Sequence, residues 1–382
     1  MGDKSPPLLD MMGQLIATPS ISSSHATLDM SNEPVIDLLA NWLNSSGFEV
    51  NRQNCAAGKY NLIATLGDGS DGLILSGHTD TVPMDEKLWH SSPFTLTERD
   101  NRLYGLGSCD MKSFLAMAIA ASHAYERRHF KRPLTIVATA DEETSMSGAQ
   151  LLARNGHRLG RYCVIGEPTA LKPVRQHKGI IMESVRFVGA SGHSSDPMLG
   201  NNALEGMHEF IQRLLVFRDN LQSRYKDPAF KVAVPTLNLG HIHGGDNPNR
   251  ICGACELHFD LRFLPGMELE ELRADIQAMA REVAAQRALE VEFESLFHGI
   301  PAMSTAADSP LTRHLEQATG SAAGSVAFGT EAPYFNALDC ETIIMGPGSI
   351  NQAHQPDEYL SMDQIKPTVH LLQGLIKHFC LQ

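Results

Sequence analysis

Acidic and imidazole side chains follow short apolar segments of this chain, where they could bind metal ions and move protons. His78 and Asp80 come directly after the apolar segment 73–77 and are two residues apart. In an extended chain they therefore point to the same face, and the carboxylate can set which imidazole nitrogen is free to bind a metal. Asp110 stands before a helix-like segment at residues 111–128.

Further candidates follow two more apolar segments, residues 134–140 and 162–166, and stand in a loop near the C-terminus. They are Asp141, Glu142, Glu143, Glu167 and His354. Many carboxylates in one cleft would repel one another and raise their pKa values, and divalent cations remove that conflict. Two imidazoles with several carboxylates form a mixed nitrogen and oxygen donor set, which suits Zn²⁺, Co²⁺ or Mn²⁺ better than Ca²⁺.

Each of these patterns has an ordinary structural explanation when it is taken alone. A His-x-Asp is commonly a solvated turn, adjacent glutamates are commonly an exposed helix start, and Asp110 could be an N-cap. The whole ordered set is harder to explain in that way, because its members follow several strand-like segments. Cys252 and Cys255 form the only close cysteine pair, and we interpret them as an incidental pair in a strand region.

The elements that would hold these groups alternate between apolar strands and helices in the first half of the chain. Continuous apolar strands separated by helices are typical of a mostly parallel α/β sheet that is covered on both faces. Sites in such sheets lie at the carboxyl ends of the strands, so we expect the acids and imidazoles to converge there. The same style resumes after about residue 294, with a strand at 342–345 and a closing helix at 363–378.

The pattern differs over residues 183–293, where half-exposed strands alternate with helices at about 203–222 and 269–286. This segment predicts a separate, smaller α+β domain. We therefore predict a catalytic domain formed by residues 1–182 and 294–382 and interrupted by that insert.

Composition limits the partners and the cellular setting. The 382 residues carry a formal net charge of −13, so binding to nucleic acid or to an anionic membrane surface is not expected. The longest apolar stretch, around residues 114–121, is too short to span a bilayer, and the N-terminus lacks the pattern of a secretory signal. Seven scattered cysteines fit a cytoplasmic protein with reduced thiols.

Taken in order, these motifs resemble the dinuclear zinc amidohydrolases of the M20 metallopeptidase family. The resemblance runs nearly from end to end of the chain. It is carried by residues 77–83 (GHTDTVP), 105–112 (GLGSCDMK), 141–143 (DEE), 166–169 (GEPT) and His354, with support from residues 15–22, 235–246 and 346–359. It implies that the insert is a ferredoxin-like domain that serves for dimerisation and as a lid.

The resemblance also implies a role for each matching residue. One Zn²⁺ or Co²⁺ ion would be held by His78 and Glu167, and a second by Glu143 and His354. The carboxylate of Asp110 would be shared by the two ions. Glu142 would be the general base, and Asp80 would orient His78.

Other implied groups would contact the substrate. His193 would stabilise the tetrahedral oxyanion, in similar enzymes often from the partner subunit, and a surface turn is the alternative explanation. Glu331 would meet a side-chain ammonium group. The implied substrate-binding residues are Arg262, Asn249, Thr330 and Gly348. An exposed strand charge is the alternative for Arg262, and a plain loop is the alternative for Gly348.

The activity that the resemblance implies is hydrolysis of the small N-acetylated amino acid N²-acetyl-L-ornithine to L-ornithine and acetate, in arginine biosynthesis, by a homodimer. Alternatives in the same family are desuccinylation of succinyl-diaminopimelate and a dipeptidase activity. A non-catalytic metal-stabilised binding protein is the alternative from another class, and the intact Glu142 argues against it because a general base is not needed to hold metal. Similar enzymes are associated with thiol stimulation, which makes glutathione a further candidate cofactor.

Overall fold

The computed structural model describes residues 5–382 and divides into two compact units. Unit 1 comprises Met1–Arg175, Thr305–Gly324 and Glu331–Gln382, and unit 2 comprises Gln176–Ser304 and Ser325–Thr330. The predicted insert, residues 183–293, therefore lies inside a longer unit 2. The unit is longer because its first and last long strands extend past both predicted boundaries.

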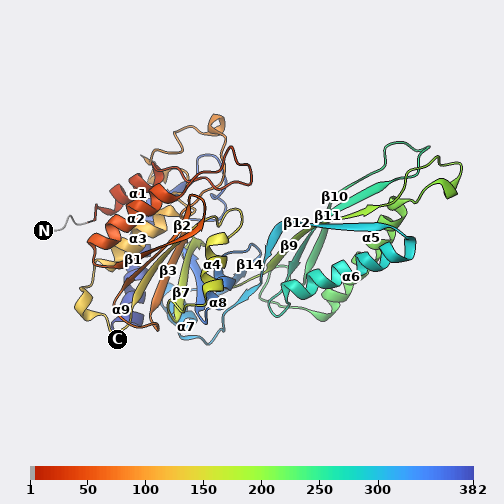
Figure 1. The fold of residues 1–382 in the computed structure, drawn as a ribbon. Coiled ribbons are helices and arrows are strands. Elements are labelled where there is room, and N and C mark those ends of the chain that lie inside the picture. The colour runs from red at the N-terminus through yellow and green to blue at the C-terminus, as the bar shows by residue number, and fades with distance from the viewer. Residues whose placement is uncertain (1–4) are drawn as a thin grey trace. The chain divides into compact units, whose positions relative to one another are not determined.

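Unit 1 is built on a sheet whose four central strands are parallel, in the order β6-β3-β7-β15; β3 and β7 are labelled in Figure 1. These strands are Leu134–Thr139 (β6), Leu73–His78 (β3), Tyr162–Pro168 (β7) and Glu341–Gly346 (β15). Nearly every residue in them is buried, as expected of apolar parallel strands covered on both faces. The predicted mostly parallel α/β sheet is confirmed for this centre.

Antiparallel strands extend the sheet at both edges. They are Glu49–Ala56 (β1) and Lys59–Leu66 (β2) beyond β6, and Val174–His177 (β8) beyond β15, with Met303–Ser304 (β13) antiparallel to β8. The short strand Gly324–Val326 (β14) also pairs with β8. A separate three-stranded sheet is formed by Thr97–Arg99 (β4), Arg102–Tyr104 (β5) and Tyr359–Ser361 (β16).

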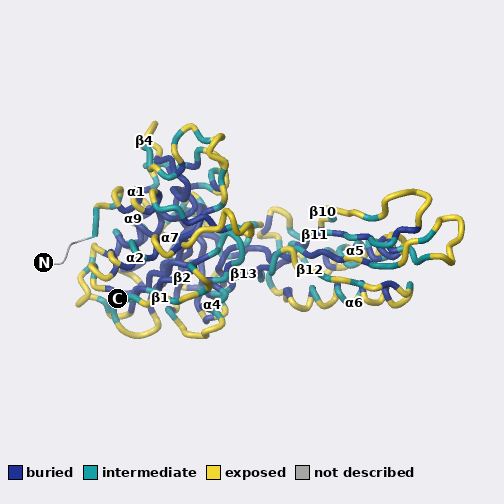
Figure 2. The backbone as a smooth tube through the Cα atoms, turned by 45° about the horizontal axis from the view of Figure 1, so that its top comes forward, coloured by how far each residue is buried: buried dark blue, intermediate teal, exposed yellow. Residues whose placement is uncertain are grey.

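The main core of unit 1 lies on one face of the large sheet, and Figure 2 shows the interior of the unit as buried. It contains side chains from Leu8–Ile16 (α1), Glu33–Ser45 (α2), Lys112–Ser122 (α3), Pro310–Thr319 (α7) and Ile365–Cys380 (α9). Strand residues such as Leu73 and Leu75 also belong to it, whereas Ile74 between them is buried outside it, so both faces are covered. Two helices, Ser147–Asn155 (α4) and Ala332–Asn336 (α8), pack against each other outside this core. Helix α3 ends earlier than the predicted residue 128.

Unit 2 is a four-stranded antiparallel sheet with the strand order β10-β11-β9-β12. The chain order is Gly179–Val188 (β9), Ala203–Arg224 (α5), Thr236–Gly244 (β10), Ala254–Phe263 (β11), Leu269–Arg287 (α6) and Glu290–Ile300 (β12). This β-α-β-β-α-β order is the ferredoxin-like arrangement that was predicted. Burial alternates at every residue of β11, because one face of the sheet packs against α5 and α6 (Figure 1).

In the part of the chain that the structure describes, the remaining short elements are four 3₁₀ turns: Glu86–Leu88 (η1), Arg127–His129 (η2), Pro197–Leu199 (η3) and Met362–Gln364 (η4). Within residues 5–382, no helix combines the length and the apolar character that crossing a membrane requires. All seven cysteines are free thiols, and Cys252 and Cys255 are both buried.

Candidate metal centre

The predicted metal-site groups of unit 1 lie where its central parallel strands end. His78 is the last residue of β3, Glu142 and Glu143 stand in the turn after β6, and Glu167 lies near the end of β7. His354 lies in the loop that follows β15. Parallel strands present their carboxyl ends at one edge of the sheet, which is why residues so far apart in sequence come together.

His78 and Asp110 form the first contact of the centre. The Nε2 atom of His78 lies 3.1 Å from Oδ1 of Asp110, and both residues are buried. Nδ1 of His78 lies 2.9 Å from the backbone carbonyl oxygen of Asp80. Because a carbonyl can only accept, Nδ1 is the nitrogen that carries the proton, and Nε2 remains for a metal ion.

The side chain of Asp80 has a second task that the sequence did not predict. Its Oδ1 accepts a hydrogen bond from the backbone N–H of Glu142 at 3.2 Å, and its Oδ2 accepts one from that of Glu143 at 3.0 Å. Its carboxylate is 3.7 Å from Nδ1 of His78, farther than the backbone carbonyl. Asp80 therefore positions His78 mainly through its main chain and positions the two glutamates through its carboxylate.

His354 contacts the same carboxylates from the other direction. Its Nε2 atom lies 3.0 Å from Oε2 of Glu143 and 3.6 Å from Oδ2 of Asp110. The two oxygens of Asp110 thus face different imidazoles, Oδ1 towards His78 and Oδ2 towards His354. This is the arrangement that a carboxylate shared by two cations requires.

The donor atoms lie close enough to surround cations. Two groups have one ligand atom from each residue within 4.8 Å of the others: His78, Asp110 and Glu143, and His78, Glu142 and Glu167. The Oε1 atom of Glu167 is buried and has no hydrogen-bond partner. A buried carboxylate oxygen without a partner is costly, and a bound cation would satisfy it. The nitrogen and oxygen donors therefore fit divalent metal ions.

The charges within the centre shift one another's pKa values. Burial, together with the charge of Glu167, raises the pKa of Glu142 well above its ordinary value. Burial and the charge of Asp110 do the same to the pKa of Glu167. The hydrogen bond to Glu143 raises the pKa of His354 to about 9. The carboxylates of this site repel one another, and bound cations would relieve that repulsion.

A buried ion pair holds the turn that carries Glu142 and Glu143. Asp141 precedes them in a left-handed conformation, with φ of 55°. Its Oδ1 atom accepts from Nζ of Lys59 at 2.7 Å and from Oγ of Ser22 at 2.9 Å. Nζ of Lys59 also lies 2.7 Å from Oδ1 of Asp29, and its side chain is only 6% exposed. The sequence analysis did not predict a role for Lys59 or Ser22, because no local pattern links them to a turn so distant in sequence.

Glu358 is a further group that the sequence analysis missed. Its Oε1 atom accepts from the backbone N–H groups of Cys109 at 2.7 Å and Asp110 at 3.0 Å. The carboxylate is buried, and burial raises its pKa to about 8. The only signal in the sequence is an acid close to His354 in the same loop.

Gly348 lies in unit 1, in the loop after β15. Its φ is 82°, and a Cβ atom at this position would approach Sγ of Cys109 to 2.4 Å. Only glycine lets the backbone come this close to the segment that carries Asp110. Glu331, at the start of α8, is fully buried, and burial raises its pKa to about 7.

The other predicted substrate contacts lie in unit 2, and their roles remain predictions. His193 is exposed, and its Nδ1 atom lies 2.8 Å from Oγ of Ser195. The carbonyl of Asn249 accepts from the N–H of Ser194, so the loops of His193 and Asn249 lie together. Arg262 is half-buried, and its Nε and Nη2 atoms donate to the carboxylate of Asp260 at 2.8 Å and 3.0 Å. Thr330 is buried.

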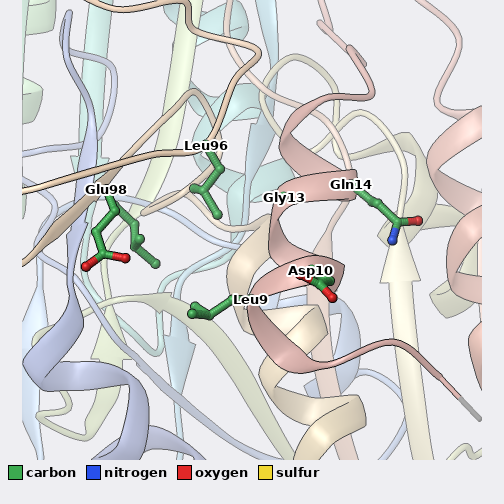
Figure 3. Close-up of a pocket in the computed structure, with 7 residues that line it drawn as sticks. Leu9, Asp10, Gly13, Gln14, Leu96 and Glu98 are labelled. Carbon is green, nitrogen blue, oxygen red and sulfur yellow. The ribbon is translucent and has the colours of Figure 1, made fainter.

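A large cavity in unit 1 contains none of these predicted residues. Its volume is about 440 Å³, and it lies between α1 and the β4–β5 strands (Figure 3). Leu9, Leu96 and Leu103 contribute apolar side chains to it. A smaller cavity of about 170 Å³ borders His354.

Comparison with known proteins identifies the family. The model of peptidase family M20/M25/M40 matches residues 74–378, and the chain belongs to this family. The acetylornithine deacetylase of Edwardsiella ictaluri is 50% identical over 382 residues, which cover 100% of both chains. That of Proteus mirabilis is 48% identical over 100% of this chain and 99% of its own. The fold is similar to that of an M20 family metallo-carboxypeptidase from Sulfolobus solfataricus, with a TM-score of 0.74, 16% identity and coverage of 98% and 99% of the two chains.

Proposed function

We propose that this chain hydrolyses N²-acetyl-L-ornithine to L-ornithine and acetate, a step of arginine biosynthesis. The observation that carries this conclusion is the 50% identity, over the full length of both chains, to a protein named acetylornithine deacetylase. The metal centre of unit 1 supplies the chemistry that such a hydrolysis needs. The chain is therefore a metal-dependent hydrolase of a linear amide.

The ligand assignment is part of the proposal. His78 and Glu167 would hold one Zn²⁺ or Co²⁺ ion, Glu143 and His354 would hold the other, and Asp110 would bridge them. The two oxygens of Asp110 that face different imidazoles support this division, and so does the unpartnered Oε1 of Glu167. When bound, such cations lower the pKa of water and polarise the acyl oxygen of an amide.

Glu142 is the proposed general base. It would take a proton from the attacking water and give it to the leaving amine, so that the amide C–N bond breaks and acetate and the free amine form. Burial and the charge of Glu167 raise the pKa of Glu142, which favours a group that must bind and return a proton. The carboxylate of Asp80 accepts a hydrogen bond from the backbone N–H of Glu142 and thereby positions the side chain of Glu142.

The groups of unit 2 would complete the site in a homodimer. His193 would stabilise the oxyanion in trans. Arg262 would bind the substrate's α-carboxylate, and Asn249 and Thr330 would be further substrate-binding residues. Asp260 already engages Nε and Nη2 of Arg262, so a substrate carboxylate would use Nη1 or displace Asp260. Gly348 would bring backbone close to the substrate.

The decisive experiment measures acetate release from N²-acetyl-L-ornithine beside succinyl-diaminopimelate and a dipeptide. We expect the acetylated substrate to be preferred, activity to disappear on chelation, and Zn²⁺ or Co²⁺ to restore it. Preference for one of the other two substrates would overturn the proposal. Binding of metal without any turnover would instead indicate a metal-stabilised binding protein.

Two finer proposals need separate tests. Mixing inactive His193→Ala and Glu142→Gln chains should restore part of the activity if His193 acts across a dimer, and should restore none if it acts within its own chain. The proposed setting is the cytoplasm, where the seven thiols would stay reduced. Glutathione would count as a cofactor only if it raises activity where a non-thiol reductant at the same potential does not.

A further inference from the structure

The sheet of unit 2 has two faces of different character. Leu257 and Phe259 of β11 belong to the core that also contains side chains of α5 and α6. Glu256 and His258 alternate with them along the strand and are only partly buried. Because successive side chains of a strand point to opposite faces, Glu256 and His258 stand on the face away from this core, which we call the outer face.

A β-bulge in β10 brings two more histidines to the outer face. Strand β10 lies beside β11 at the edge of the sheet (Figure 1), and its Leu239 packs against the core. The register then shifts between Leu239 and His241, so that Gly240 is an extra residue. A bulge reverses which residues face which side. Beyond it, His241 and His243 therefore stand on the outer face, and both are exposed.

The four polar side chains of this face form two cross-strand pairs. His241 lies opposite His258, and His243 lies opposite Glu256. The ring centroids of His241 and His258 are 4.8 Å apart, and Nε2 of His258 is hydrogen-bonded to Oε1 of Glu256. That hydrogen bond lowers the pKa of Glu256, so this side chain is a carboxylate at neutral pH. We call these four residues the histidine cluster of unit 2.

The cluster offers donor atoms that suit a transition metal ion. Three imidazoles and one carboxylate match the nitrogen and oxygen ligands that Zn²⁺ binds in proteins. The side chains of His241 and His243 are exposed, so they can turn towards the other pair without leaving a packed position. Arg186 of β9 also lies opposite Glu256, but its Nη1 atom pairs with Glu292 at 3.2 Å. The cation of the neighbouring strand therefore already has an acidic partner of its own.

We propose that His241, His243, Glu256 and His258 form a Zn²⁺ site, separate from the metal centre of unit 1. All four residues belong to unit 2, so the site is complete within that unit. Each imidazole binds through one nitrogen as the neutral ring, and Glu256 binds through its carboxylate. Four protein ligands fill the tetrahedral shell of Zn²⁺ and leave no position for a reacting water. The site is therefore structural, and it does not depend on the proposed function.

The bound ion links two strands beside the connection that carries a proposed substrate contact. Residues 245–253 join β10 to β11, and His243 lies next to the last residue of β10. The carbonyl of Asn249, within this connection, accepts from the N–H of Ser194 at 3.0 Å. Holding the two strand ends together restrains local opening of the connection. Hydrogen exchange of residues 245–253 should therefore slow when Zn²⁺ is added.

The test uses the full chain with both imidazoles of the metal centre removed. In His78→Ala/His354→Ala the centre of unit 1 keeps only carboxylate ligands, so imidazole around a bound ion must come from elsewhere. We expect this chain to retain one Zn²⁺ ion by elemental analysis after dialysis, and X-ray absorption at the zinc edge to show an imidazole-rich shell. Adding His243→Ala and His258→Ala should abolish this ion and the slowed hydrogen exchange.

A matched control removes an imidazole from another surface of unit 2. His208 of α5 is exposed, so His208→Ala in the same background should keep the ion and its imidazole-rich shell. Failure of the background chain to bind Zn²⁺ would overturn the site, and so would a shell of oxygen ligands alone. Equal loss of zinc from His208→Ala and from His243→Ala/His258→Ala would mean scattered surface binding, which also contradicts the proposal. These readouts do not use turnover, so none of these results bears on the proposed hydrolysis.

Discussion

The two imidazoles of the metal centre stand in very different surroundings. The side chain of His78 is 1% exposed and ends a central strand, whereas that of His354 is 51% exposed and lies in a loop. We call His78, Asp80 and Asp110 the buried side of the centre, and His354 with Glu143 the loop side. The buried side is held by strand ends and by hydrogen bonds to main-chain groups.

The difference shows which part of the centre the fold positions and which part the charges position. Nδ1 of His78 is held by a carbonyl, an uncharged contact that persists at any charge state of the site, in addition to the contact of its Nε2 with Asp110. The contacts of Nε2 of His354 are with the carboxylates of Glu143 and Asp110. We therefore expect the loop side to depend more strongly on bound cations than the buried side does.

Replacing the general base should produce the largest effect. Glu142→Gln removes the proton acceptor while keeping its size, and general-base catalysis contributes roughly 10²–10⁴-fold to the rate. We expect kcat for acetate release to fall by about that factor while metal content, measured by elemental analysis, stays at the wild-type value. Glu98→Gln, an exposed acid of unit 1, is the control. Normal turnover by Glu142→Gln would remove this residue from the mechanism.

Removing one imidazole from each side tests the comparison directly. His354→Ala should lose the cation of the loop side and keep the other, because the buried side retains its own ligands. His78→Ala should lose the cation that it is proposed to hold with Glu167, and it should also weaken the loop-side cation, since His78 lies in the cluster of donor atoms formed with Asp110 and Glu143. The measurement is metal content per chain after dialysis against increasing chelator. Equal metal loss from the two variants would mean that the two sides do not differ as their burial suggests.

Lys59 supports the turn of Glu142 and Glu143 from a distance. Lys59→Met leaves the largely buried carboxylate of Asp141 without its cation, and breaking a buried pair in this way costs up to about 3–5 kcal/mol. Asp29 is 32% exposed, so the loss of its pair adds little to this cost. Because Asp141 begins the turn of Glu142, kcat should also fall, by roughly 10–100-fold, as expected when a supporting contact is lost. Steady-state kinetics and chemical denaturation measure the two effects.

Lys59→Arg is the matched variant, because it keeps the charge and can still bridge both acids. It should recover most of the lost stability and most of kcat. A variant Lys59→Met that is less stable but has the wild-type kcat would show that the ion pair serves the fold alone and does not position Glu142.

The chain shows clearly what a sequence can predict about such a site. His78 and Glu167 were singled out because apolar strands mark where an α/β sheet ends, and Asp110 because it precedes a helix. Their roles as metal ligands and the ferredoxin-like insert were predicted through the family resemblance. Lys59 and Glu358 were missed, because their partners are main-chain groups or side chains far away in sequence. A lysine in a strand or an acid in a loop is ordinary, and only the folded arrangement shows that its charge is buried.

Asp80 illustrates the same limit. The spacing His-x-Asp predicted a carboxylate that orients the imidazole, yet the nearer contact is the backbone carbonyl at 2.9 Å. The carboxylate instead binds the N–H groups of Glu142 and Glu143. The spacing of two residues in a strand determines whether their side chains lie on the same face of the sheet, but it does not determine which atom of a residue makes the contact.

A third histidine, His177 of β8, sharpens the comparison by separating burial from charge. It is fully buried like His78, but its Nδ1 atom donates to the carbonyl of Lys178 at 2.9 Å, and its Nε2 atom has no hydrogen-bond partner. Burial therefore lowers the pKa of His177 to about 4. An unfolded histidine has a pKa of about 6.5, so the unfolded chain binds more protons between these two values, and stability falls as the pH falls through this window.

The expected loss is the smallest of the four effects, about 1 kcal/mol between pH 7.5 and pH 5.5 for this single group. Denaturant titrations at the two pH values measure it, and His177→Phe is the informative variant because it removes the titrating group and stays apolar and aromatic. The difference in stability between wild type and variant should change by that amount across the window. If the difference stays constant, His177 keeps an ordinary pKa and burial alone does not set the charge of an imidazole in this fold. The contrast with His78 would then have to come from the carboxylates alone.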